Sequence, residues 1–102
     1  MKPLSFAATT AFHQHFGEYF SEMLSKTLTR VFTSFPFDMF VFEPSGDKAM
    51  SIRLAGYNCT TGERDEATVV LTLPAAVDRP FWLKIDDYGN RYHATFLFPE
   101  EY

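Results

Sequence analysis

The spacing of apolar residues changes at Pro36 from a helical to an extended period, and this change limits the chain to few folds. From Thr10 to Ser34 the apolar residues recur at steps of three and four, which is typical of one face of a helix. Pro36 ends that pattern, because proline disfavours helix at the residue before it. A helix over 10–34 would be about 37 Å long. Because that is long for a small domain, we expect either that one end projects or that the helix bends, with Gly17 as the candidate position.

After Pro36 apolar and polar residues alternate, which is typical of strands with one buried face. The connections between these segments are short, whereas a parallel crossover needs about a dozen residues or more. The chain is therefore predicted to be a single α+β domain over 1–102. A long N-terminal helix would pack on one face of a four- or five-stranded antiparallel meander sheet. The alternating segments predict strands over residues 37–43, 49–57, 67–73, 81–86 and 91–98.

Phenylalanine accounts for 12 of the 102 residues, and aromatic residues for 18%. Each aromatic side chain can bury roughly 150–250 Å², so one interpretation is a dense core built from few residues. In the other, surplus rings lie on the surface and mark an interface. If the strands pair in the simplest register, the sheet face away from the helix carries a patch of rings and cations. Its predicted members are Phe40, Phe42, Arg53, Trp82, Lys84 and Leu97.

Three alternatives to this exposed patch stay open. The sheet could curl around the rings, or the N-terminal segment 2–8 could cover them. A homodimer through the same face would also hide them. A second candidate docking surface is the polar loop 58–66, and its charged residues are Glu63, Arg64, Asp65 and Glu66.

Charge and cysteine content narrow the classes of partner. The net charge is −4 and no two of the nine Lys and Arg residues are adjacent, which argues against direct nucleic-acid binding. No apolar run approaches the roughly 18–20 residues of a membrane span, so no membrane partner is expected. Cys59 is the single cysteine, and the apolar stretch near Met1 is too interrupted for a signal peptide. These features predict a cytoplasmic protein.

Catalytic and metal-binding patterns are weak. His13 and His15 point about 200° apart on a helix, so they do not converge on one metal, although His15 and Glu18 share a face. Cys59 with His93 as its base is a pairing that nothing local supports. The glycines form no phosphate-binding loop. We therefore expect no catalytic residues, no metal and no cofactor.

The function most consistent with these features is non-catalytic protein–protein interaction. We expect a small cytoplasmic inhibitor or adaptor, of the phage-encoded inhibitor or immunity-protein type. It would dock on a larger host or cognate protein, which could be one that processes nucleic acid. The alternative is a small-ligand-binding domain with an aromatic-lined pocket between helix and sheet. Polar contacts in that pocket would come from Tyr57, Tyr88, Tyr92 and His93.

Overall fold

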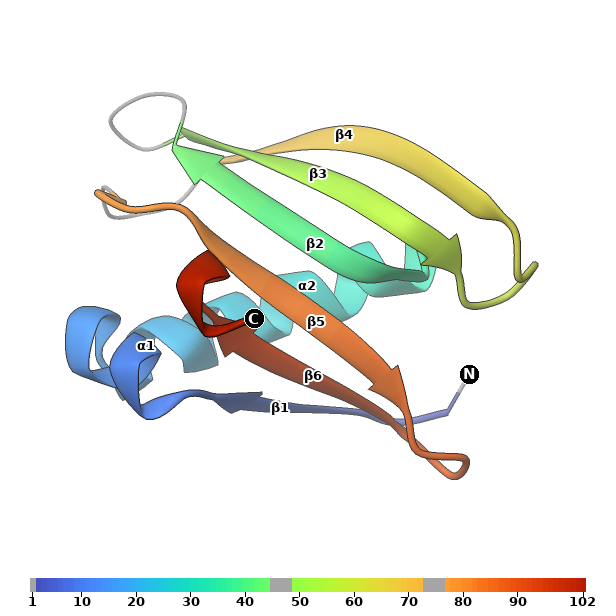
Figure 1. Cartoon of the computed structure of the whole chain (residues 1–102), viewed down its shortest axis with the longest axis horizontal. Helices are drawn as coiled ribbons and strands as arrows, with labels where there is room; N and C mark the ends of the chain where they lie inside the picture. The colour runs from blue at the N-terminus through green and yellow to red at the C-terminus, as the bar shows by residue number, and fades with distance from the viewer. Residues whose placement is uncertain (1, 45–48, 73–76) are drawn as a thin grey trace.

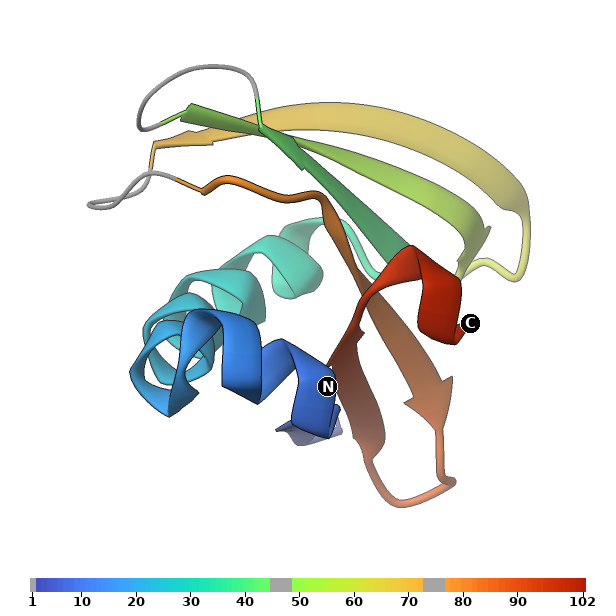
Figure 2. The same cartoon turned by 60° about the vertical axis from the view of Figure 1, so that its left-hand side comes forward.

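The computed structural model describes residues 2–44, 49–72 and 77–102 and has an α+β architecture. Two helices lie in the concave side of a strongly curved six-stranded sheet (Figures 1 and 2). The elements are β1 (Leu4–Ala8), α1 (Thr10–Phe16), α2 (Glu18–Ser34), β2 (Phe37–Pro44), β3 (Ala49–Asn58), β4 (Arg64–Thr72), β5 (Phe81–Asp87), β6 (Tyr92–Leu97) and a 3₁₀ turn (Pro99–Glu101).

The predicted single helix over 10–34 is two helices, and the break is at the expected glycine. The hydroxyl of Thr9 caps α1 by accepting from the Phe12 N–H at 3.2 Å. Gly17 has a φ of 86°, which L side chains rarely adopt, and its N–H donates to the carbonyl of His13. The chain therefore changes direction at Gly17, so that both helices fit beneath the sheet.

The sheet is mixed, so the predicted four- or five-stranded antiparallel meander is only roughly correct. Its strand order is β1-β6-β5-β2-β3-β4. β2, β3 and β4 form a meander, but β5 pairs with β2 instead of β4. Segment 2–8 contains a strand, β1, that runs parallel to β6. Short connections exclude parallel pairing of consecutive strands, because a parallel pair needs a long crossover. β1 and β6 are the first and last strands, and the helices and strands between them provide that crossover.

Most of the phenylalanine surplus is core. Phe12 stacks on Phe96 with ring centroids 5.1 Å apart, and Phe42 stacks on Phe81 at 4.4 Å. The first contact ties α1 to the inner face of the sheet, and the second joins β2 to β5. The buried phenylalanines are Phe12, Phe20, Phe32, Phe37, Phe40, Phe42, Phe81, Phe96 and Phe98.

The predicted exposure of Phe40 and Phe42 is wrong, since both are fully buried. In the observed hairpin register Phe40 lies opposite Leu54, and Val41 lies opposite Arg53. Changing a hairpin register by one residue moves an entire alternating set to the other face. The register therefore turns both rings toward the helices and places Val41 on the outer face.

Candidate interaction surfaces

The outer face of the sheet, which points away from the helices, brings together four of the predicted patch residues. Strand pairing places Trp82 between Leu97 and Val41, and Val41 is followed by Arg53. In the adjacent row Lys84 lies beside Met39. Leu97, Trp82, Lys84 and Arg53 therefore share one face, as the alternation predicted.

An aromatic pair lies on this face. The rings of Trp82 and Tyr102 meet edge to face with centroids 5.5 Å apart. Tyr102 is 72% exposed, whereas Leu97 and Val41 are each only 7% exposed. The outer face thus has a packed apolar centre with an exposed ring above it. Sequence reasoning missed Tyr102, because a tail residue belongs to no periodic pattern.

The chain after β6 is held in place by polar contacts. Glu101 accepts hydrogen bonds from the Thr9 hydroxyl at 2.8 Å and from the Phe98 N–H at 3.0 Å. Arg79 forms an ion pair with Glu100, and its guanidinium lies 3.5 Å from the ring centroid of Phe98. These contacts keep the 3₁₀ turn against the domain and Tyr102 beside Trp82.

The second predicted surface, residues 63–66, adjoins the first. Glu63, Arg64, Asp65 and Glu66 are all exposed at the beginning of β4. Glu66 lies opposite Ala55, in the same cross-strand row as Met39 and Lys84. The Arg64 guanidinium lies 5.3 Å from the ring centroid of Tyr57. The outer face therefore extends from Trp82 to Glu66 and Arg64 in β4, whereas Asp65 points to the other face of this strand.

The candidate thiol nucleophile lacks an activating group. Cys59 is half-buried in a hollow of about 360 Å³ at the Asp87 end of β5. Burial, assisted by the carboxylate of Asp38, raises the pKa of the thiol, so Cys59 is neutral at pH 7. His93 contacts other groups: its Nδ1 lies 3.1 Å from the Ser5 hydroxyl and its ring stacks on Tyr88. The structure does not bring Cys59 and His93 into contact.

The two histidines of α1 diverge. Nε2 of His13 lies 3.1 Å from the Ser21 hydroxyl, whereas Nε2 of His15 lies 2.9 Å from a carboxylate oxygen of Asp78. Across residues 2–44, 49–72 and 77–102, no three His, Cys, Asp or Glu side chains converge as metal ligands. In the same part of the chain no helix is both long and apolar enough to span a membrane.

Most of the space between helices and sheet, where the alternative function needs a pocket, is filled by packed rings. Phe12 alone contacts Phe16, Phe20, Phe81, Phe96 and Phe98. The polar residues proposed for that pocket are spread over the surface. Tyr57 and Tyr92 line the hollow at Cys59, while Tyr88 stacks on His93.

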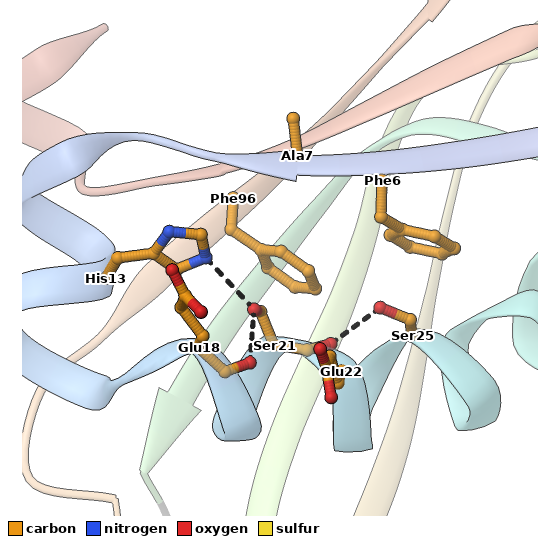
Figure 3. Close-up of a pocket in the computed structure, with 8 residues that line it drawn as sticks. All are labelled: Phe6, Ala7, His13, Glu18, Ser21, Glu22, Ser25 and Phe96. Carbon is orange, nitrogen blue, oxygen red and sulfur yellow. Dashed lines mark hydrogen bonds between the residues drawn. The ribbon is translucent and has the colours of Figure 1, made fainter.

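A cleft that the sequence did not reveal lies between β1 and α2 (Figure 3). It has a volume of about 210 Å³. Phe6 and Ala7 of β1 line one side, and the α2 side consists of Glu18, Ser21, Glu22 and Ser25. His13 and Glu18 had drawn attention only as candidate metal ligands. The cleft depends on the position of β1, for which the sequence gives no periodic signal.

The serine and histidine in this cleft form a structural contact. The Ser21 hydroxyl donates to the carbonyl of Glu18 at 2.9 Å. The same hydroxyl lies 3.1 Å from Nε2 of His13, and the tautomer of His13 decides which of the two groups donates in this contact. The hydrogen bond links α1 to α2 across the break at Gly17.

Comparisons of this chain with protein-family models, with curated proteins and with solved structures find no match.

Proposed function

We propose that this chain is a non-catalytic protein-interaction domain that docks on a larger protein through the outer face of its sheet. The observation that carries the proposal is the position of Trp82 on that face, edge-on to the exposed ring of Tyr102. Tryptophan and tyrosine are enriched among the residues that contribute most to binding at protein interfaces. The apolar side chains of Leu97 and Val41 flank Trp82 on the neighbouring strands and support this pair.

The charges around the pair indicate the partner. The chain carries a net charge of −4, and three exposed carboxylates, Glu63, Asp65 and Glu66, lie around the beginning of β4, beside the outer face. A protein with a basic surface beside an apolar pocket is complementary to this arrangement. Nucleic-acid-processing proteins have such surfaces, which supports a partner of that class. Arg53 and Lys84 supply hydrogen-bond donors beside the apolar centre, and their aliphatic stems extend it.

The proposal of a non-catalytic role rests on the state of two candidate nucleophiles, Ser21 and Cys59. The Ser21 hydroxyl donates to a backbone carbonyl, and burial keeps the Cys59 thiol protonated. The same proposal includes three further points: the protein is an inhibitor or adaptor, its partner is a host or cognate protein, and its location is cytoplasmic. The small size, the acidic net charge and the single cysteine support these points.

The test is affinity purification with two matched variants. Tagged wild-type protein, Trp82→Ala and Tyr19→Ala would each be used to capture proteins from a lysate of the native host, with detection by mass spectrometry. Tyr19 is a suitable control because it is an aromatic residue of α2 that is 79% exposed and lies away from the outer face. We expect a stoichiometric partner with wild type and Tyr19→Ala that is lost with Trp82→Ala. Equal capture by all three proteins would contradict docking at Trp82.

A further inference from the structure

β1 is an edge strand with an unpaired side. It is the terminal strand of the sheet and pairs only with β6. The Thr9 N–H donates to the Phe96 carbonyl, and the Tyr92 N–H donates to the Pro3 carbonyl. Because backbone groups alternate in direction along a strand, the N–H and C=O groups of Leu4, Phe6 and Ala8 point away from β6. These residues offer a partner strand three donors and three acceptors.

The side chains of β1 do not protect this edge. Proteins commonly block strand addition with charged residues or proline on their edge strands. β4, at the other edge of the sheet, carries charges only in its first three residues, Arg64 to Glu66, and its remaining six residues contain neither a charge nor a proline. β1 has the sequence Leu-Ser-Phe-Ala-Ala and contains neither a charge nor a proline. β1 is uncharged along its whole length, and it is the edge that lies beside the cleft lined by Glu18 and Glu22.

The cleft beside β1 determines which strand would fit. β1 and α2 run side by side, and Glu18 and Glu22 line the cleft from α2 (Figure 3). Both carboxylates are exposed, and neither forms an ion pair with another residue in the part of the chain that the structure describes. The sheet curves around the helices, so a strand added at β1 would continue that curve over this side of α2 (Figure 2).

The spacing of the Glu18 and Glu22 carboxylates matches the distance between side chains on one face of a strand. Residues four apart on a helix are separated by about 6 Å along its axis. Side chains on one face of a strand recur at about 6.6 Å. Two basic side chains at alternate positions of the added strand would therefore each lie opposite one of Glu18 and Glu22.

We propose that the free edge of β1 binds an extended, basic segment of a partner protein by strand addition. The segment carries Lys or Arg at alternate positions that face α2. Main-chain hydrogen bonds to Leu4, Phe6 and Ala8 supply affinity, and the carboxylates of Glu18 and Glu22 select basic residues. A second copy of this chain fits less well, because its own β1 would place apolar side chains against the two carboxylates. This proposal does not depend on docking through Trp82.

The test uses a synthetic nine-residue peptide in which lysine and threonine alternate. One matched control has glutamate in place of lysine, and another carries N-methyl groups on alternate backbone amides, so that it cannot form the ladder. Binding would be measured by calorimetry, with hydrogen exchange at each backbone amide of the intact protein. We expect the lysine peptide to bind and to slow exchange at Leu4, Phe6 and Ala8. Neither control should bind comparably.

Protein variants complete the design. Replacing both carboxylates, in Glu18→Gln/Glu22→Gln, should weaken binding about tenfold, as expected for the loss of two exposed charge pairs. Trp82→Ala should leave peptide binding unchanged, which separates this proposal from docking at the outer face. Equal binding of the N-methylated peptide, or protection at β4 instead of β1, would overturn strand addition at β1. So would a lack of binding at millimolar peptide, or protection of β1 by dimerisation of the protein alone.

Discussion

The indole ring of Trp82 and the phenol ring of Tyr102 are inclined at 65° and meet with centroids 5.5 Å apart. Edge-to-face pairs of this kind contribute about 0.5–1.5 kcal/mol beyond the area that they bury. Their contact joins the end of the described chain to the middle of the outer face. Together the two rings form one aromatic surface on the outer face of the sheet.

Trp82→Ala should reduce partner binding far more than folding stability. Loss of an interface tryptophan weakens binding by about 2 kcal/mol or more. Its neighbour Phe81 is the matched control, because it points to the opposite face and is fully buried. Phe81→Ala should lower the free energy of unfolding by about 3–5 kcal/mol. Urea denaturation of both variants gives the comparison. If Trp82→Ala were as destabilising as Phe81→Ala, Trp82 would belong to the core.

Gly56→Ala should destabilise the domain more than Gly62→Ala. Both glycines have positive φ angles, 102° and 75°, so both substitutions carry backbone strain of roughly 1–2 kcal/mol. A methyl group at Gly56 would also collide with the carboxylate of Asp38, whereas the space around Gly62 is open. That carboxylate accepts a hydrogen bond from the Tyr57 N–H at 3.0 Å, so it cannot move without loss. Gly56→Ala should therefore cost about 1–3 kcal/mol more than Gly62→Ala.

Thermal or urea denaturation of the two glycine variants checks this difference. Equal loss of stability would mean that Asp38 rotates away freely and that its contact with the backbone of β3 contributes little.

The ion pair between Lys2 and Asp87 should make stability depend on pH at both extremes. Their charged atoms lie 2.5 Å apart. The Lys2 ammonium, assisted by the Gly89 N–H, holds the pKa of Asp87 below its ordinary value of 3.8. Its contribution is present above that value and is lost as the pH falls through the lowered pKa. The hydrogen bond to Asp87 raises the pKa of Lys2 above 10.5, so its contribution is complete below that pH and is lost above the raised pKa.

Carboxyl NMR titration of wild type and Lys2→Met tests this pair. In the variant the pKa of Asp87 should rise toward its ordinary value, and acid unfolding should begin at a higher pH. The Gly89 N–H donates to Asp87 at 2.8 Å in both proteins, so part of the shift should remain. An identical Asp87 pKa in both proteins would assign the shift to the turn alone.

Reversing the acidic charges around the beginning of β4 should slow association with the partner. Glu63, Asp65 and Glu66 are exposed at the beginning of β4. Their replacement by Lys removes the attraction to a basic surface and should lower the association rate by about tenfold at low salt, with a smaller effect at high salt. Stopped-flow kinetics with the purified partner gives the rate, and Glu43→Lys is the single-charge control. An association rate unaffected by the triple change would exclude steering by these charges.

Local sequence was sufficient for the helical segment, for the strands from β2 to β6 and for part of the candidate site. Thr10 to Ser34 has one apolar stripe, and its break at Gly17 and its end before Pro36 follow from backbone geometry. Alternation along β5 placed Trp82 and Lys84 on one face, because successive strand residues point to opposite sides. These features depend on residues that are close together in the chain, so they can be predicted from one sequence.

The remaining features depend on contacts between distant segments. The burial of Phe40 follows from its pairing with Leu54 and Leu83, and a slip of one residue would have exposed it. β1 exists as a strand because Leu4 to Ala8 pairs with Tyr92 to Phe96, from the other end of the chain. The sequence by itself thus determined the helix and strand periods and the residues that share a strand face. Tertiary packing decided which face is buried and where the cleft lies, because register and parallel pairing are set by the long-range burial of apolar side chains.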